Sequence, residues 1–293
     1  MSELRSSFCI IASGVLWGLL PLFIKLFAAH GFSSEQTVFV RVGFAAVMMV
    51  AWLAIRNPSL LRIRLADSWC FVGTGIVSIM MFSYCYFRTV ESASIALAAL
   101  LLYTSPVFVL IFSMIFFKER MTRRKLLAVA STVTGCACIT GIFTHGTPGS
   151  APGAPLPVIL IGLGAGLFYS LYTIFGKYAL ARYSSVTVIT YTFIFATIGA
   201  AFLIPLPETF ARLAEPPVFL ASCGIAVFCS VGSFWLYTLG LQGVQPSKAG
   251  VLATVEPVVA TLIGILIFHE EAGIATFAGM ALILGAAVIL AKR

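Results

Sequence analysis

Residues 254–271 read TVEPVVATLIGILIFHEE, and residues 103–120 read YTSPVFVLIFSMIFFKER. At an offset of 151 positions, Pro106 meets Pro257 and Glu119 meets Glu270, so the proline-to-glutamate separation is 13 in both stretches. Further matches at nearly the same offset are Gly14 with Gly166, Trp17 with Tyr169, Lys25 with Lys177, Gly73 with Gly224, Tyr84 with Trp235, and Tyr86 with Tyr237. Several ordered matches at one offset indicate an internal repeat.

The composition is typical of a membrane protein. Hydrophobic residues make up 60% of the 293 residues, charged residues make up 10%, and the mean hydropathy is +1.07. A soluble domain carries about 25% charged residues, and a membrane-spanning helix needs about 20 mostly apolar ones. Ten such runs are found: 8–28, 36–55, 67–87, 93–117, 124–143, 157–180, 186–205, 216–239, 247–268 and 273–291. The first is interpreted as a retained helix, because no cleavage site or polar mature chain follows it.

The basic residues predict the orientation in the membrane. Of the 18 lysines and arginines, all but four fall on the side that holds both chain ends, if the ten runs cross alternately. The four on the other side are Lys25, Arg41, Arg88 and Arg212. Because cytoplasmic connections are enriched in Lys and Arg, both termini are expected in the cytoplasm and the protein in the cytoplasmic (inner) membrane.

The Gly- and Pro-rich segment 144–156 divides the ten runs into two groups of five. It is predicted to be a linker between a first repeat, 1–143, and a second, 157–293. Five crossings leave the chain on the opposite side, so the second copy must insert upside down. The sequence therefore predicts an all-α integral membrane protein with ten transmembrane helices in two five-helix inverted-topology repeats, an architecture common among secondary transporters.

Several other classes of function are disfavoured. The nearest approach to a phosphate-binding P-loop, Gly176–Lys177, has Leu171 where the first glycine belongs, and HExxH and GxSxG are absent from the sequence. No enzyme activity, cofactor or metal site is expected, and the seven cysteines are interpreted as small packing residues. The net charge of +8 lies in short gaps between apolar runs, which fits a lipid surface and not nucleic acid.

Aromatic side chains are dense near the middle of several predicted helices. The candidates for substrate binding are Trp17, Tyr84, Tyr86, Tyr103, Tyr169, Tyr172, Trp235 and Tyr237. Hydroxyl and indole N–H groups need partners in lipid, so such residues face either a neighbouring helix or a cavity. Packing and an aromatic-lined cavity for an amphipathic solute both remain open.

Four residues are candidate hinges. Pro106 and Pro257 each remove a backbone hydrogen bond inside a predicted span, which gives either a static kink or a hinge. Gly14 and Gly166 belong to GxxxG patterns, which allow close helix packing and could also allow bending.

Glu256 is the acid placed well inside a predicted span, and its counterpart in the first half is Ser105. Intramembrane acids are costly and usually face a cavity or a cation. Its expected partner is a substrate ammonium group, a proton, or Lys248 two turns away; a structural hydrogen bond is the alternative. Arg41 has no charged counterpart either, because Phe193 stands there, so symmetry assigns it no role.

The two halves resemble the EamA repeats of the drug/metabolite transporter superfamily. The resemblance rests on SPVFVLIFSMIFFKER with Gly135 and on EPVVATLIGILIFHEE with Gly285. Length and the aromatic residues of the third and fourth helices are similar to those of amino acid exporters in this superfamily. The resemblance implies export of amino acids, aromatic ones among them, by alternating access. The expected partners are a small-molecule substrate and the lipid bilayer, and the sequence is compatible with a monomer. A multidrug or other metabolite exporter is the first alternative, and a non-transporting sensor the second; direction and coupling stay open.

Overall fold

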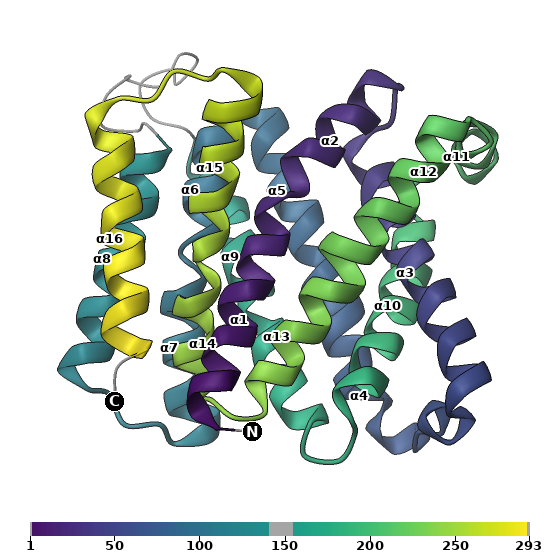
Figure 1. Cartoon of the computed structure of the whole chain (residues 1–293), viewed down its shortest axis with the longest axis horizontal. Helices are drawn as coiled ribbons and strands as arrows, with labels where there is room; N and C mark the ends of the chain where they lie inside the picture. The colour runs from purple at the N-terminus through teal and green to yellow at the C-terminus, as the bar shows by residue number, and fades with distance from the viewer. Residues whose placement is uncertain (1, 141–154, 292–293) are drawn as a thin grey trace.

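The computed structural model describes residues 2–140 and 155–291, and this part of the chain is helical with no strand (Figure 1). The linker predicted at 144–156 lies mostly outside the described residues. The helices of the first half are α1 (Glu3–Gly18), α2 (Leu20–Ala29), α3 (Ser34–Arg56), η1 (Pro58–Leu61), η2 (Leu65–Asp67), α4 (Ser68–Val72), η3 (Gly73–Met80), α5 (Met81–Ser92), α6 (Ile95–Leu102), α7 (Ser105–Phe117) and α8 (Arg123–Ile139). Those of the second half are α9 (Leu156–Ala179), α10 (Ser185–Ala201), α11 (Leu206–Leu213), α12 (Pro216–Ile225), η4 (Ala226–Gly232), α13 (Ser233–Leu241), α14 (Pro246–Ala253), α15 (Val255–Phe268) and α16 (Ile274–Ala291).

Seven helical segments of the described chain are long and apolar enough to cross a membrane. They are Glu3–Ala29, Ser34–Arg56, Leu65–Ser92, Ile95–Phe117, Leu156–Ala179, Pro216–Leu241 and Pro246–Phe268. The predicted run 186–205 forms α10, and the chain then bends by 118° into α11. The runs 124–143 and 273–291 correspond to α8 and to a shorter apolar helix, Ile274–Leu290. The protein is therefore a multi-pass helical membrane protein, and ten crossings remain a prediction.

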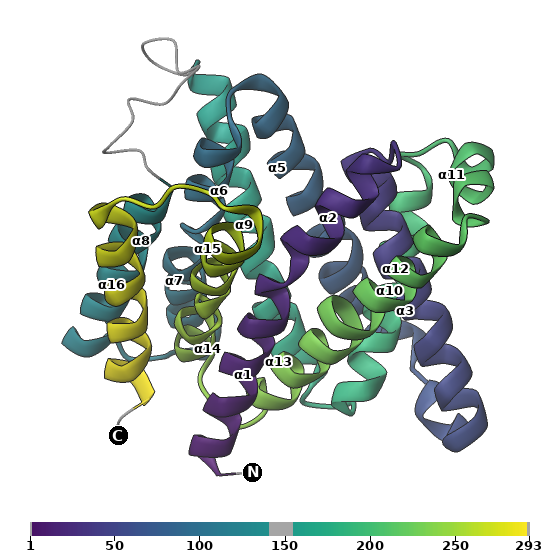
Figure 2. The same cartoon turned by 45° about the horizontal axis from the view of Figure 1, so that its top comes forward.

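Both ends of the described chain lie at the same end of the molecule (Figures 1 and 2). We call this the terminal end and the opposite one, where α2 meets α3, the distal end. α8 and α16 pack side by side at one flank, whereas α3 and α10 lie at the other. The largest group of buried apolar side chains lies between α1, α3, α9, α10, α13 and α14, so the core sits where the two halves meet.

The two proline-containing helices are interrupted instead of being smoothly kinked. α6 ends at Leu102 and α7 begins at Ser105, while α14 ends at Ala253 and α15 begins at Val255. Each proline thus lies in the first turn of a new helix, where a missing N–H leaves no bond unmade. At both interruptions a threonine hydroxyl donates a hydrogen bond to a carbonyl three residues earlier, Thr104 to Leu101 at 2.6 Å and Thr254 to Val251 at 2.5 Å.

The same two helices also end alike. Lys118 after α7 and His269 after α15 adopt left-handed backbone angles, with φ of 53° and 54°. The next residue then donates its N–H back to the helix: Glu119 to the Ser113 carbonyl at 3.2 Å, and Glu270 to the Gly264 carbonyl at 3.0 Å. This left-handed cap stops each helix and directs the glutamate that follows it.

Glycines bring α1 and α9 against the interruptions. A Cβ atom on Gly14 would lie 2.7 Å from the Ala253 carbonyl oxygen, and one on Gly166 would lie 2.7 Å from the Leu101 carbonyl oxygen. Real Cβ atoms do not approach backbone oxygens so closely, so these positions admit only glycine without a shift of the helices. The packing role predicted for Gly14 and Gly166 is therefore present in the structure, and their role as hinges stays a prediction.

We predict that Gly14→Ala and Gly166→Ala each lower the free energy of unfolding by about 1–3 kcal/mol, because the added methyl group overpacks a helix contact. The measurement is the unfolding temperature of the purified protein in detergent. Gly43→Ala is the matched control, because its Cβ would lie 3.6 Å from Thr197 Cγ2, an ordinary contact, and alanine favours a helix. A Gly14 or Gly166 variant as stable as the Gly43 variant would contradict the packing role.

Candidate substrate cavity

A cavity of about 240 Å³ lies between the two halves. Trp17, Tyr169 and Glu256 line its inner part, near the start of α15, while Ile24 and Ser34, both exposed, line it near the distal end. Its walls are mostly apolar, and the remaining aromatic lining residues are Phe32, Phe82, Tyr86, Phe87, Tyr103 and Phe234. Of the predicted site residues, the structure brings five together here: Trp17, Tyr86, Tyr103, Tyr169 and Glu256.

Trp17 is held rigidly at the inner part of this cavity. Its ring is 5% exposed and packs edge-on against Phe234, with 5.0 Å between ring centroids, and against Tyr237 at 5.3 Å. α1 can approach α15 closely because Gly14 and Gly18 face it: a Cβ on Gly14 would lie 3.3 Å from the Glu256 backbone nitrogen, and a Cβ on Gly18 would meet the side chain of Val259. The tryptophan thus serves both as core and as cavity wall.

Glu256 is partly buried in the first turn of α15 and accepts a hydrogen bond from the Tyr169 hydroxyl at 3.2 Å. The N-terminal end of a helix carries partial positive charge, which favours a carboxylate there. Lys248, one of the partners expected for Glu256, instead donates to Glu3 Oε1 at 2.8 Å. That expectation was wrong because the interruption at Thr254 separates α14, which carries Lys248, from α15.

Arg41 also lines the cavity, from α3. It is 7% exposed, its Nε atom has no hydrogen-bond partner, and no carboxylate of the described chain lies within ion-pair distance of it. The sequence count assigned this arginine to the connections opposite the chain ends, and the structure places it within α3, facing the cavity. Its charge and that of Glu256 are close enough to interact. Sequence reasoning missed Arg41 because the repeat gave it no counterpart; its position within an apolar run was the available signal.

A second, smaller cavity of about 30 Å³ lies on the other side of Trp17 and Tyr169, which line both. Tyr172 and Tyr237 line this small cavity and are 5% and 3% exposed. Their hydroxyls bond to threonines of facing helices, Tyr172 with Thr238 at 2.7 Å and Tyr237 with Thr173 at 2.6 Å. In this conformation the two tyrosines pack α9 against α13.

Two predicted aromatic residues line neither cavity. Tyr84 is 41% exposed and Trp235 is 45% exposed, both on the outside of the helix bundle. Tyr84 lies two residues from Tyr86, and Trp235 two residues from Tyr237, so the members of each pair point to different sides of a helix. We therefore leave Tyr84 and Trp235 out of the candidate site.

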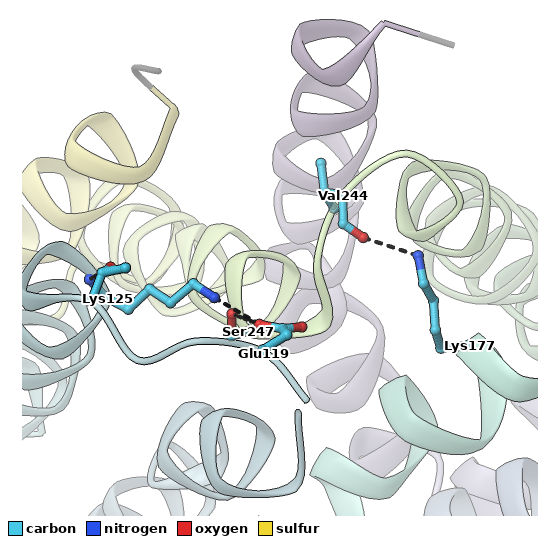
Figure 3. A network of polar contacts seen from close by, with 6 residues as sticks. Glu119, Lys125, Lys177, Val244 and Ser247 are labelled. Atoms are coloured by element: carbon cyan, nitrogen blue, oxygen red, sulfur yellow. Dashed lines mark hydrogen bonds and ion pairs between the residues drawn. The ribbon is translucent and has the colours of Figure 1, made fainter. Parts of the chain in front are cut away.

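A group of polar contacts lies at the terminal end, and among those drawn in Figure 3 the contact of Glu119 with Ser247 joins the two halves. Glu119, after α7, binds Lys125 of α8 at 2.8 Å and the Ser247 hydroxyl of α14. Lys177 of α9 donates to the Leu241 and Val244 carbonyls, at 2.6 and 3.1 Å. The side chains of Glu119 and Lys125 are 4% and 11% exposed, so this network is shielded from water.

The distal end has a different arrangement at the equivalent positions of the sequence repeat. Lys25 of α2 pairs directly with Glu270, after α15, at 3.2 Å and lies over the Phe268 ring. Both side chains are more than half exposed. In the sequence repeat, Lys25 corresponds to Lys177, and Glu270 corresponds to Glu119. Lys25 and Glu270 pair with each other at the distal end, whereas Lys177 and Glu119 bind other groups at the terminal end.

The chain is similar to several known proteins. An uncharacterized transporter of Archaeoglobus fulgidus is 28% identical over 286 residues, covering 97% of this chain and 95% of the relative. The uncharacterized transporter YetK of Bacillus subtilis is 23% identical, covering 97% and 84%. A solved crystal structure that is 22% identical has the same fold, with a TM-score of 0.78 over 97% of this chain and 95% of that one. The sequence matches one family twice, over residues 4–141 and 156–292, and so the chain belongs to the EamA-like transporter family.

Proposed function

We propose that this protein is a secondary transporter that exports amino acids, aromatic and other neutral ones, across the cytoplasmic membrane by alternating access. The observation that carries the proposal is the cavity between the halves, which combines aromatic walls with two charged side chains, the buried Arg41 and the partly buried Glu256. Pockets for small molecules are typically apolar with a few placed polar groups. The resemblance of the sequence to the amino acid exporter YddG supports amino acids as the substrate class.

A multidrug exporter of the same fold is the second candidate. Aromatic rings with an acid suit a flat organic cation, because rings attract cations and a carboxylate neutralises them. Arg41 argues against this candidate, since a cation entering the cavity would meet an uncompensated positive charge.

Two copies in inverted orientation are the architecture that we propose for the transporter. The recurrence of the interruption after Leu102 and Ala253, the left-handed caps at Lys118 and His269, and the π-helical segments η3 and η4 support two copies of one fold. The basic connections support placing the terminal end in the cytoplasm. With that orientation the larger cavity faces outward.

The two cavities support alternating access. Tyr86 and Leu102 line the larger cavity, and their counterparts in the repeat, Tyr237 and Ala253, line the smaller one. If the halves exchange conformations, the smaller cavity widens toward the terminal end and the larger one closes, while Trp17 and Tyr169 stay between them. Rocking of one repeat against the other is the usual way in which inverted repeats give access from both sides.

The polar contacts at the two ends support a partner exchange. Glu119 Oε1 is buried without a hydrogen-bond partner, and Lys177 is close enough for its charge to interact with Glu119. When the segment 241–247 moves away, Lys177 loses its two carbonyl acceptors and can pair with Glu119, as Lys25 pairs with Glu270 at the distal end. The exchange would keep both buried charges compensated, which limits the cost of opening.

The transport activity is tested with purified protein in liposomes and a panel of radiolabelled amino acids and organic cations. We expect uptake of aromatic and other neutral amino acids above protein-free liposomes. The panel is repeated with a pH gradient: faster uptake with the gradient indicates proton exchange, and equal uptake indicates a facilitator. No flux of any amino acid would contradict the proposal, and flux of organic cations alone would favour the multidrug exporter.

Closure of the terminal end is tested with a cysteine pair. Because the side chains of Glu119 and Ser247 are in contact, we expect that a short thiol cross-linker bridges Glu119→Cys with Ser247→Cys and reduces amino acid flux at least about tenfold, because the end can no longer open. A reductant that cleaves the linker should restore the flux.

The two single-cysteine variants are the matched controls, and treatment with the same reagent should leave the flux of each variant at its own untreated value. Mass spectrometry confirms the bridge. Full flux through bridged protein would show that this end does not open during transport.

A further inference from the structure

We infer that Arg41 and Glu256 form a two-point anchor that selects free α-amino zwitterions: Arg41 binds the carboxylate of the solute, and Glu256, held by Tyr169, binds its ammonium group. The inference rests on the proposed function and deepens it by assigning the charged groups of the substrate to named residues. It excludes solutes that carry only one of the two charges.

Arg41 is the first part of the anchor. An arginine that is 7% exposed and lacks an ion-pair partner is unfavourable, because burial removes the water that would solvate its charge. Its Nε atom is buried without an acceptor, and the residue lines the cavity. The planar guanidinium group binds carboxylates through two parallel hydrogen bonds. A solute carboxylate entering this cavity would supply the missing partner.

Glu256 is the second part. Its Oε2 atom accepts the Tyr169 hydroxyl at 3.2 Å, which orients the carboxylate and leaves its other acceptor positions unused by the described chain. An ammonium group carries three donors and no acceptor, so it complements such a carboxylate. Neither Lys248 nor Lys25 competes for it, because they pair with Glu3 and Glu270.

Arg41 and Glu256 line one cavity without touching each other. Their charges interact, yet no ion pair forms between them. In an α-amino acid the carboxylate and the ammonium group are attached to one carbon atom, so the solute can lie between two opposite charges that do not touch. Its side chain would then lie against the rings of Trp17, Phe82 and Phe234.

The charge balance explains the exclusion of other solutes. A zwitterion leaves the net charge of the cavity unchanged and gives each buried group a partner. An amine without a carboxylate leaves Arg41 unpaired, and an acid without an ammonium group leaves Glu256 unpaired. A site with buried polar groups rejects an analogue that cannot pair with them, often by large factors.

The test compares three solutes with one aromatic ring: L-phenylalanine, 2-phenylethylamine, which lacks the carboxylate, and 3-phenylpropionate, which lacks the ammonium group. Affinity is measured with the full-length protein in lipid nanodiscs, and uptake is measured in liposomes. We expect the wild type to prefer L-phenylalanine by about tenfold or more over either analogue, which is the size of one lost charged hydrogen bond.

Two variants should each lose the discrimination against a different analogue. Arg41→Gln should bind L-phenylalanine at least about tenfold more weakly and no longer discriminate against 2-phenylethylamine. Glu256→Gln should lose a similar factor and no longer discriminate against 3-phenylpropionate. Arg41→Lys and Glu256→Asp keep the charges, so they should keep the preference for L-phenylalanine with a smaller loss of affinity. If a glutamine variant does not fold, the test is made with these two variants.

Arg88→Gln and Glu91→Gln are the matched controls, because these residues form an exposed pair away from the cavity. Both should behave like the wild type.

Amino acid transport with unchanged selectivity in all variants would overturn the anchor and leave the proposed function standing. Selective binding of L-phenylalanine without flux of any amino acid would support the anchor and overturn the transport function. A wild type that neither binds nor moves L-phenylalanine would overturn both.

Discussion

Backbone groups inside the hydrocarbon have no water to bond with, so every interruption of a membrane helix must be satisfied by the protein itself. The breaks after Leu102 and Ala253 meet this requirement with threonine hydroxyls and with prolines in a first turn. Gly14 and Gly166 allow α1 and α9 to cover the freed carbonyls. The rest of the site depends on this arrangement, because the second break begins α15 and so places Glu256 at a helix N-terminus beside the cavity.

Three lysines at the terminal end are paired within the protein. Lys248 and Lys125 have carboxylate partners, and Lys177 has carbonyl partners at the terminal end. Arg41 and Glu256 differ from these pairs, because each faces the cavity without an oppositely charged protein group in contact. Charges that are shielded from water in this way are unfavourable unless an oppositely charged group pairs with them. A solute that pairs with both Arg41 and Glu256 would hold the two halves together around itself. The same contacts would then favour both binding of the solute and closure of the cavity.

Much of the helical layout was predictable from the sequence, because apolar length and the proline-to-glutamate spacing reflect local constraints. Trp17, Tyr86, Tyr103, Tyr169 and Glu256 were predicted and lie together in the structure. Residue type alone could not distinguish Tyr84 and Trp235 from the aromatic residues that line a cavity. Their spacing of two residues from Tyr86 and Tyr237 did indicate a different face of the helix. Arg41 could not be paired with Glu256, because the two are far apart in sequence and the repeat relates neither to a charged residue. The predicted pairing of Lys248 with Glu256 was wrong, because the break between α14 and α15 removes the alignment that residues eight positions apart have on a continuous helix.

Arg41 comes from the first half of the chain and Glu256 from the second, and their counterparts in the opposite half are Phe193 and Ser105, respectively. Two identical halves related by a two-fold axis would place two arginines or two glutamates around the centre, never one of each. In the proposed architecture, two identical halves would surround the centre with the same charges on both sides, so the two sides of the cavity would not differ. Because the two halves of this chain differ at these positions, the cavity has a positive and a negative side, and the proposed anchor would fix the direction in which a dipolar solute lies.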